Sequence, residues 1–221
     1  MKHINGETNV KTLRFGSGSI KGIGKEIGRF LITTMEVPWA LVKNEIGGQP
    51  EEVIFINNVD QENLDKLLLK IPDIDAVIGI GGGMAVDAAK YFSWRRDVRL
   101  ISIPTIVSVD AFLTPAAGVR CNNKVIYVGN SSPDPLVIDY DIIRTAPKTL
   151  NIAGIGDLLS IHTASFDWQH AENNTKSEYP FSQDMILSGK KIINNEAKTI
   201  ERISMDDLKK FDQAAKGKFA K

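Results

Sequence analysis

Short apolar runs alternate with segments of helical apolar spacing over the first two thirds of the chain. Runs of apolar and β-branched residues that are closed by Gly, Pro or Asn are typical of buried strands. Such runs predict strands over residues 12–15, 31–34, 53–56, 76–80, 98–103 and 136–139. Helical spacing predicts helices over 20–30 and 39–46, after Asp60 as N-cap, and after the glycines at 81–83. This alternation predicts an α/β fold with a doubly wound parallel sheet.

The pattern changes after Pro104. Residues 105–117 are small and polar and predict a loop, and two short strands around Asn122 and Asn123 predict a hairpin. A short helix is expected over 141–150, and from residue 151 onward only helical patterns remain, over 156–173 and 182–202. The sequence therefore predicts an α/β dinucleotide-binding domain over 1–150 and a helical domain over 151–221.

The stretch from 76 to 90, AVIGIGGGMAVDAAK, joins an apolar strand to a helix through Gly81, Gly82 and Gly83. Glycines accept positive φ and leave room for a ligand to approach the backbone. The helix that follows presents unpaired N–H groups, which are a natural seat for a phosphate. We therefore expect the three glycines to bind the diphosphate of a nucleotide. A tight turn without a ligand is the alternative, because the spacing is neither GxGxxG nor followed by GK[ST].

Polar side chains follow the strand that ends at Pro104, and this strand should lie beside the glycine turn. They are Thr105, Ser108, Asp110 and Thr114. Ligands of open α/β sheets bind at the carboxyl ends of strands, so these groups could bind a cofactor amide, ribose hydroxyls or a polyol. The alternative is that they only form the loop.

Carboxylates and histidines elsewhere have plainer interpretations. Asp157 follows a glycine pair at an expected helix start, where it could be an N-cap or one ligand of a metal ion. His162 lies about 140° around the helix from Asp157, and His170 lies about 12 Å further along, so both are interpreted as structural or surface residues. Glu36 follows an early strand and could bind a ribose or simply form a turn.

Composition excludes several classes of function. The 221 residues are 43% hydrophobic and 24% charged, with 27 basic and 27 acidic residues and a net charge of zero, so nucleic acid is not the expected partner. Cys121 is the only cysteine, which excludes an intrachain disulfide and fits a reducing compartment. The N-terminus has no apolar signal region, and no apolar run approaches the roughly 20 residues of a membrane span. We expect a cytoplasmic protein.

Three blocks, GIGGGMAVDAAK, IPTIVSVDAFLTPAA and AGIGDLLSIHTASFDWQHAENN, occur in an order and spacing that resemble a known superfamily. It contains the iron-type alcohol dehydrogenases, glycerol dehydrogenases and dehydroquinate synthases, and the chain most resembles its glycerol-1-phosphate dehydrogenase branch over residues 10–200. The resemblance implies a Rossmann-like parallel-sheet domain followed by an all-helical domain. It also implies NAD(P)-dependent, metal-assisted oxidation and reduction of a polyol or polyol phosphate, such as reduction of dihydroxyacetone phosphate to sn-glycerol 1-phosphate.

The resemblance also implies roles for individual residues. The cofactor, NAD or NADP, would be held by Gly81, Gly82, Gly83, Met84, Ala85, Val86, Asp87, Thr105, Ser108 and Thr114. Asp110 matches a carboxylate that contacts substrate hydroxyls, and Asp157 matches the first ligand of a catalytic metal, usually Zn²⁺. Lys90, like Asp87, matches a polar position of the first block.

The chain also departs from the family pattern. Family members are longer, and their other two metal ligands are histidines that would follow Lys221, so the chain is expected to be a truncated or naturally short homologue. Helices that are absent would leave apolar surface exposed and favour a homo-oligomer. Two alternatives remain: a catalytically inactive nucleotide-binding homologue, and a dehydroquinate synthase-like cyclase. The cyclase is disfavoured because its glutamate ligand and substrate-binding lysine do not match GIGD and TPAAGVR.

Overall fold

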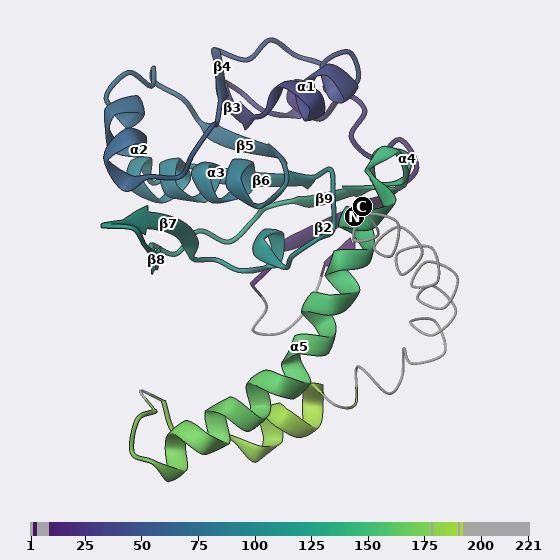
Figure 1. The fold of residues 1–221 in the computed structure, drawn as a ribbon. Coiled ribbons are helices and arrows are strands. Elements are labelled where there is room, and N and C mark those ends of the chain that lie inside the picture. Colours follow the sequence, from purple (N-terminus) through teal and green to yellow (C-terminus); the bar gives the residue numbers. More distant parts are fainter. Residues whose placement is uncertain (1, 4–8, 178, 190, 192–221) are drawn as a thin grey trace, which may run out of the picture. The chain divides into compact units, whose positions relative to one another are not determined.

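A sheet of six parallel strands, with one antiparallel strand at its edge, forms the centre of the first part of the chain (Figure 1). The strand order is β1-β2-β9-β6-β5-β3-β4. The bounds are Lys2–His3 (β1), Thr12–Gly16 (β2), Phe30–Thr34 (β3), Glu52–Phe55 (β4), Ala76–Gly81 (β5), Arg99–Pro104 (β6) and Leu136–Asp139 (β9). All six predicted strands are present within one or two residues of their expected ends, and the predicted α/β parallel sheet is confirmed.

The computed structural model describes residues 2–3, 9–177, 179–189 and 191. By their contacts, the residues divide into two units, Met1–Asn151 and Ile152–Lys221, which are described separately. Assigning these units to cofactor binding and to metal and substrate binding stays a prediction.

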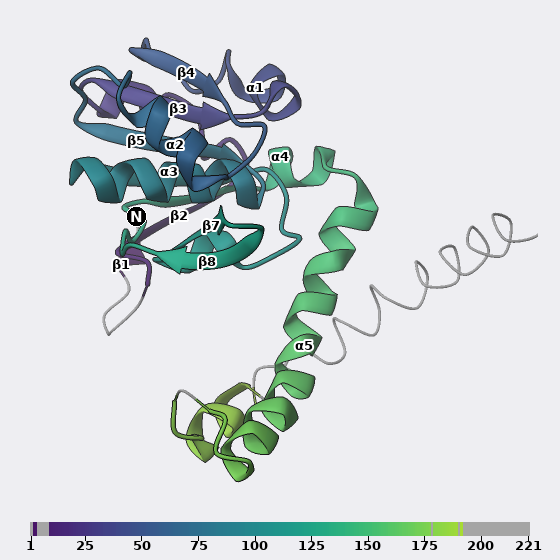
Figure 2. The ribbon, with the colours of Figure 1, turned by 60° about the vertical axis from the view of Figure 1, so that its left-hand side comes forward.

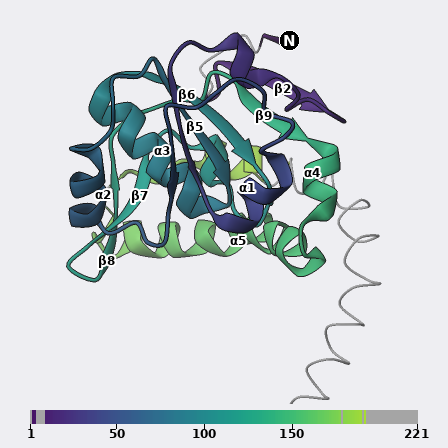
Figure 3. The ribbon, with the colours of Figure 1, turned by 90° about the horizontal axis from the view of Figure 1, so that it is seen from above.

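Helices cover both faces of the sheet (Figures 2 and 3). Consecutive strand residues point to opposite faces, and both faces of the central strands are apolar, as expected of a parallel sheet. Val77 of β5 packs with α2 (Gln61–Leu68) and α3 (Gly83–Arg96), whereas Ile78 packs with α1 (Glu36–Val42) and α4 (Tyr140–Thr145). The central strand therefore contributes to two cores.

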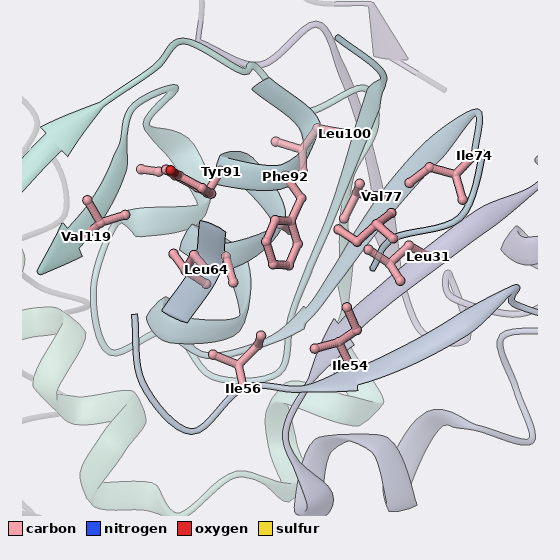
Figure 4. Close-up of a cluster of buried hydrophobic side chains, with 14 residues drawn as sticks. Leu31, Ile54, Ile56, Leu64, Ile74, Val77, Tyr91, Phe92, Leu100 and Val119 are labelled. Carbon is pink, nitrogen blue, oxygen red and sulfur yellow. The ribbon is translucent and has the colours of Figure 1, made fainter. Parts of the chain in front are cut away.

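Helix α3 is buried on nearly all sides. Its Phe92 points between the sheet and Leu64 of α2 (Figure 4), and Ala88 and Ala89 pack in the same core. The helix is covered away from the sheet by β7 (Ala117–Cys121), through residues such as Val119. Most of this helix is therefore buried between the sheet and the hairpin, and its exposed residues lie mainly at its C-terminal end.

The predicted hairpin is confirmed. Strands β7 and β8 (Lys124–Val128) pair antiparallel around Asn122 and Asn123, whose φ values are 50° and 61°. Two positive φ values in a two-residue loop are typical of the turn that suits the twist of a hairpin, and asparagine tolerates them well.

The helix predicted over 20–30 is wrong. That segment forms turns and a short 3₁₀ helix, η1 (Ile23–Glu26). Gly22 has a φ of 72°, and Gly24 lies so close to Gly47 that a side chain would collide with the carbonyl oxygen of Gly47. Ile20 and Ile23 are buried, as their spacing suggests, but the glycines bend the chain where a helix would need to continue.

The helix predicted over 39–46 begins earlier, at Glu36, and ends at Val42. The preceding strand ends at Thr34 as expected, and Pro38 lies in the first turn of the helix, where a missing N–H group costs no hydrogen bond. Asp60 does precede α2, but its side chain makes no capping hydrogen bond.

The last described helix of the first unit continues into the second. Helix α5 extends over Lys148–Asn173, directly after Pro147, so the helix expected to begin at Gly156 starts eight residues earlier. Residues 183–189 are also helical, and the rest of the helix predicted over 182–202 lies outside the described residues apart from position 191. Among the described helices, none is both long enough and apolar enough to cross a membrane.

Candidate functional site

The glycine turn joins the central strand β5 to the N-terminus of α3. Gly81 has a φ of 146°, and a Cβ there would lie 3.0 Å from Cβ of Ala85, so this position requires glycine. Gly82 is the N-cap and offers no side chain, and the first turn of the helix contains no acidic residue. The first amides of α3 therefore have no partner within their own helix, and with the helix dipole they favour an anion.

Neighbouring strand β3 fixes this turn from one side. The hydroxyl of Thr33 donates to the carbonyl of Ala85 at 2.8 Å, and that of Thr34 donates to the carbonyl of Ile80 at 2.9 Å. Both threonines are fully buried. Gly79 lets α3 approach closely, because a Cβ there would lie 2.7 Å from Cβ of Ala89. The start of α3 is thus held at a defined distance from the ends of β3 and β5.

The loop after β6 lies against the other side of the turn. The amide of Thr105 donates to the carbonyl of Gly81 at 3.0 Å, and Thr105 is buried. A Cβ at Gly82 would lie 2.8 Å from Cδ1 of Ile106, and one at Gly83 would lie 3.6 Å from Val109. The structure therefore brings Thr105 and the glycine turn together, as the sequence predicts.

The remaining polar residues of this loop are less enclosed. Ser108 is half-buried, and Asp110 is exposed at the start of the short 3₁₀ helix η2 (Ala111–Leu113). The amide of Leu113 donates to the carbonyl of Asp110 at 2.7 Å. Asp110 therefore lies at the surface of the segment that flanks the turn.

A buried lysine connects α3 to the same segment. Lys90 is 1% exposed, and its ammonium group donates to Oδ1 of Asp87 (2.9 Å), Oγ1 of Thr114 (3.2 Å) and the carbonyl of Ala116 (2.9 Å). Burial raises the pKa of the Asp87 carboxyl group, against the opposing effects of Lys90 and of the Gly118 amide. The resemblance implies that Asp87 and Thr114 contact the dinucleotide, but in the structure their side chains bind Lys90.

No role for Lys90 follows from the sequence beyond its match to the family block. The burial of Lys90 could have been suspected from the sequence DAAK. Its small residues indicate a helix packed on several sides, and the i, i+3 spacing puts the Asp87 carboxylate within reach of the lysine. Its other partners, Thr114 and Ala116, come from a distant segment and have no local signal.

Strands β3 and β5 form the point where the sheet changes its winding. They are neighbours, but the helix after β3 lies on one face and the helix after β5 lies on the other. Ligands of doubly wound sheets bind outside the carboxyl ends of such strands. Pro38 of α1 lies near Gly81, where a Cβ would be 3.7 Å from its Cγ, and Glu36 lies in the same first turn. Binding of a ribose by the Glu36 carboxylate stays a prediction.

Asp157 belongs to the second unit and occupies the middle of α5, so the expectation that it caps a helix is wrong. His162 stacks edge-on against Phe166 (5.1 Å between ring centroids), and Nε2 of His170 lies 3.4 Å from the side-chain amide of Asn174. In the described part of the chain, no three His, Cys, Asp or Glu side chains come together as metal ligands. A single carboxylate does not suit Zn²⁺, which takes three or four protein ligands, so the described donors do not form the implied zinc site.

Solved structures define the class of fold. Glycerol dehydrogenase from Schizosaccharomyces pombe superimposes with a TM-score of 0.65 at 24% identity, covering 77% of this chain and 48% of its own. A probable glycerol dehydrogenase from Sinorhizobium meliloti gives a TM-score of 0.66 at 21% identity, covering 89% and 58%. The fold is that of the glycerol dehydrogenases.

The chain belongs to the iron-containing alcohol dehydrogenase family, whose model matches residues 32–147, more than half of the sequence. It is 41% identical over 98 residues to a glycerol-1-phosphate dehydrogenase (NAD(P)+) from Aeropyrum pernix, covering 44% of this chain and 28% of that protein. A protein of the same name from Archaeoglobus fulgidus is 31% identical over 156 residues, covering 68% and 44%. The resemblance drawn from the sequence is confirmed, and the chain spans less than half the length of both relatives.

Proposed function

We propose that this chain binds NAD(P)H and belongs to an oxidoreductase that reduces dihydroxyacetone phosphate to sn-glycerol 1-phosphate. The observation that carries the proposal is the glycine turn of Gly81–Gly83 at the N-terminus of α3, beside Thr105 and within the stretch that matches the family. The names of the relatives support the substrate. The bound dinucleotide would supply the hydride.

The chain's own residues have distinct tasks in this proposal. The amides that follow Gly82 bind the diphosphate, because they point out of the helix with the positive end of its dipole. Thr105 and Ser108 flank the dinucleotide from the loop after β6. Asp110 accepts hydrogen bonds from substrate hydroxyls and so orients the reacting carbon toward the nicotinamide.

A metal ion is implied by the family, with Asp157 as one ligand. Because the described donors do not complete a zinc site, no step of the reaction is assigned to a metal here. Hydride transfer requires that the substrate carbon and the nicotinamide ring are held together, which is the task given to the loop and the turn.

Titration of the purified chain with NADH and NADPH tests the proposal, using fluorescence transfer from its three tryptophans. We expect saturable binding of at least one of the two dinucleotides. Absence of binding to both would refute the proposal. Turnover is then tested by adding dihydroxyacetone phosphate, with and without Zn²⁺, and measuring the loss of the near-ultraviolet absorbance of the reduced dinucleotide as it is oxidised. Binding without turnover would support the catalytically inactive homologue instead.

A further inference from the structure

Lys90 is an unusual residue for its surroundings. It lies on a helix enclosed by apolar side chains, and its neighbours Ala88 and Ala89 are fully buried. Removing an ammonium group from water is costly unless hydrogen bonds compensate, and apolar residues in place of a buried ion pair are often neutral or stabilising. The ammonium group of Lys90 has three acceptors, so the charge is accommodated, but stability alone does not explain why a lysine stands here.

The three acceptors indicate what the lysine does. Asp87 lies one turn earlier on the same helix, whereas Thr114 and Ala116 belong to the segment between η2 and β7. The hydroxyl of Thr114 also donates to the carbonyl of Ala111 at 3.2 Å. Lys90 therefore joins α3 to the last residues of the segment 110–116, and Thr114 extends this link to Ala111. Asp87 fixes the direction of the lysine side chain.

That segment begins with Asp110 and lies beside the glycine turn. A Cβ at Gly83 would lie 3.8 Å from Cβ of Ala111 and 3.6 Å from Cγ2 of Val109. A change in the position of residues 109–111 would therefore alter the space in front of the first amides of α3. The hydrogen bonds of Lys90 act on the same segment from its other end.

We propose that Lys90 is a positioning residue that holds the segment 110–116 against α3, so that Asp110 and the glycine turn face one ligand in a fixed geometry. The purpose of this geometry rests on the proposed function. In this proposal Lys90 acts through the position of the segment, with Asp87 and Thr114 among the groups that accept its hydrogen bonds. A segment that is already ordered saves the ligand the entropic cost of ordering it, so loosening the segment should weaken ligand binding.

Hydrogen exchange of two amides tests the positioning directly. The amide of Leu113 donates to Asp110 within the segment, and the amide of Thr105 donates to Gly81 outside it. In the Lys90→Met variant of the full chain, we expect the Leu113 amide to exchange at least about tenfold faster and the Thr105 amide to keep its rate. Lys66→Met, which removes an exposed lysine of α2, is the matched control and should change neither rate. Equal rates of Leu113 in Lys90→Met and the parent chain would overturn the proposal, as would equal acceleration of both amides, which indicates general destabilisation.

Dinucleotide titration of the same variants tests whether this positioning favours cofactor binding. We expect Lys90→Met to bind NADH or NADPH at least about fivefold more weakly than Lys66→Met, and equal affinities would overturn the functional part of the inference. A parent chain that binds neither dinucleotide would refute the proposed function, while the exchange rates still decide whether Lys90 fixes the segment. If Lys90→Met does not fold, Asp87→Asn removes the charged acceptor of Lys90, leaves the hydrogen bond from Thr114 to Ala111 in place, and should accelerate exchange at Leu113 in the same selective way.

Discussion

Replacing Gly83 by alanine separates a binding role of the glycine turn from a purely structural one. A Cβ at Gly83 would meet Val109 and Ala111 at 3.6 and 3.8 Å, which are ordinary van der Waals distances. Gly83 is also the first residue of α3, and alanine is preferred over glycine in helices by up to about 1 kcal/mol. The free energy of unfolding of Gly83→Ala should therefore equal or slightly exceed that of the parent chain.

Binding should respond in the opposite way. The new methyl group would occupy the space through which a phosphate approaches the first amides of α3. Loss of one hydrogen bond to a charged group costs about 1.5–3 kcal/mol, and each ~1.4 kcal/mol is tenfold in affinity. The dissociation constant for the dinucleotide, measured by tryptophan fluorescence transfer, should therefore rise about ten- to a hundredfold.

Two other glycines provide controls. A Cβ at Gly156 would have no heavy atom within 4 Å, so Gly156→Ala should raise stability by up to about 1 kcal/mol and leave dinucleotide affinity unchanged. In Gly79→Ala the Cβ would lie 2.7 Å from Ala89 and 3.2 Å from Cα of Val86, so unfolding in urea should show a loss of about 1–3 kcal/mol. If Gly83→Ala binds the dinucleotide as tightly as Gly156→Ala does, the turn is only a tight connection and the proposed diphosphate site is wrong.

Four further predictions concern the core, the substrate, the pH dependence and the choice of cofactor. Phe92→Ala should lower the free energy of unfolding in urea by about 3–5 kcal/mol because Phe92 is fully buried, whereas Leu69→Ala, at 87% exposure, should change it by less than about 0.5 kcal/mol; similar losses would contradict the described core. Asp110→Asn should raise KM for dihydroxyacetone phosphate and keep the dinucleotide affinity, so a parallel loss of both would argue against a substrate role. Because the pKa of Asp87 is raised in the folded state, this group stabilises the fold below its unfolded pKa and loses that contribution as pH rises through its folded pKa. The free energy of unfolding in urea, measured at several pH values, should therefore fall over this range in the parent chain relative to Asp87→Asn. A difference between the two proteins that does not change with pH would contradict the raised pKa. Glu36→Gln should improve binding of NADPH relative to NADH, since a carboxylate repels a 2′-phosphate, and an unchanged ratio would remove Glu36 from the ribose site.

The strands and the glycine turn could be predicted because their signals are local. The run from Ala76 to Ile80 is apolar on both faces, which is typical of a central parallel strand, and three glycines follow it. The proximity of Thr105 to the glycine turn then follows from topology, since neighbouring parallel strands have their carboxyl ends at the same edge of the sheet. These features need no knowledge of distant contacts.

The errors have the opposite origin. Residues 20–30 have helical apolar spacing, but Gly24 packs against the backbone of Gly47, a contact between segments that local spacing does not report. The glycine pair before Asp157 resembles a helix start, yet the helix already begins after Pro147, and the exposed side of α5 tolerates Gly156. Two acceptors of Lys90, Thr114 and Ala116, could not be predicted, because β7 and the residues before it fold back over α3 only after β6 and a long loop have intervened.

The burial of α3 explains why a dinucleotide site can be built on its N-terminus. An isolated helix of 14 residues is only marginally stable, and helix ends are the parts most prone to fray. Here Thr33 holds the carbonyl of Ala85, Gly79 brings the helix against β5, and Lys90 joins it to the loop that carries Asp110. These contacts come from three separate parts of the first unit: strand β3, strand β5 and the residues before β7. The amides that would bind a diphosphate are therefore oriented by the α/β fold itself, before any ligand arrives.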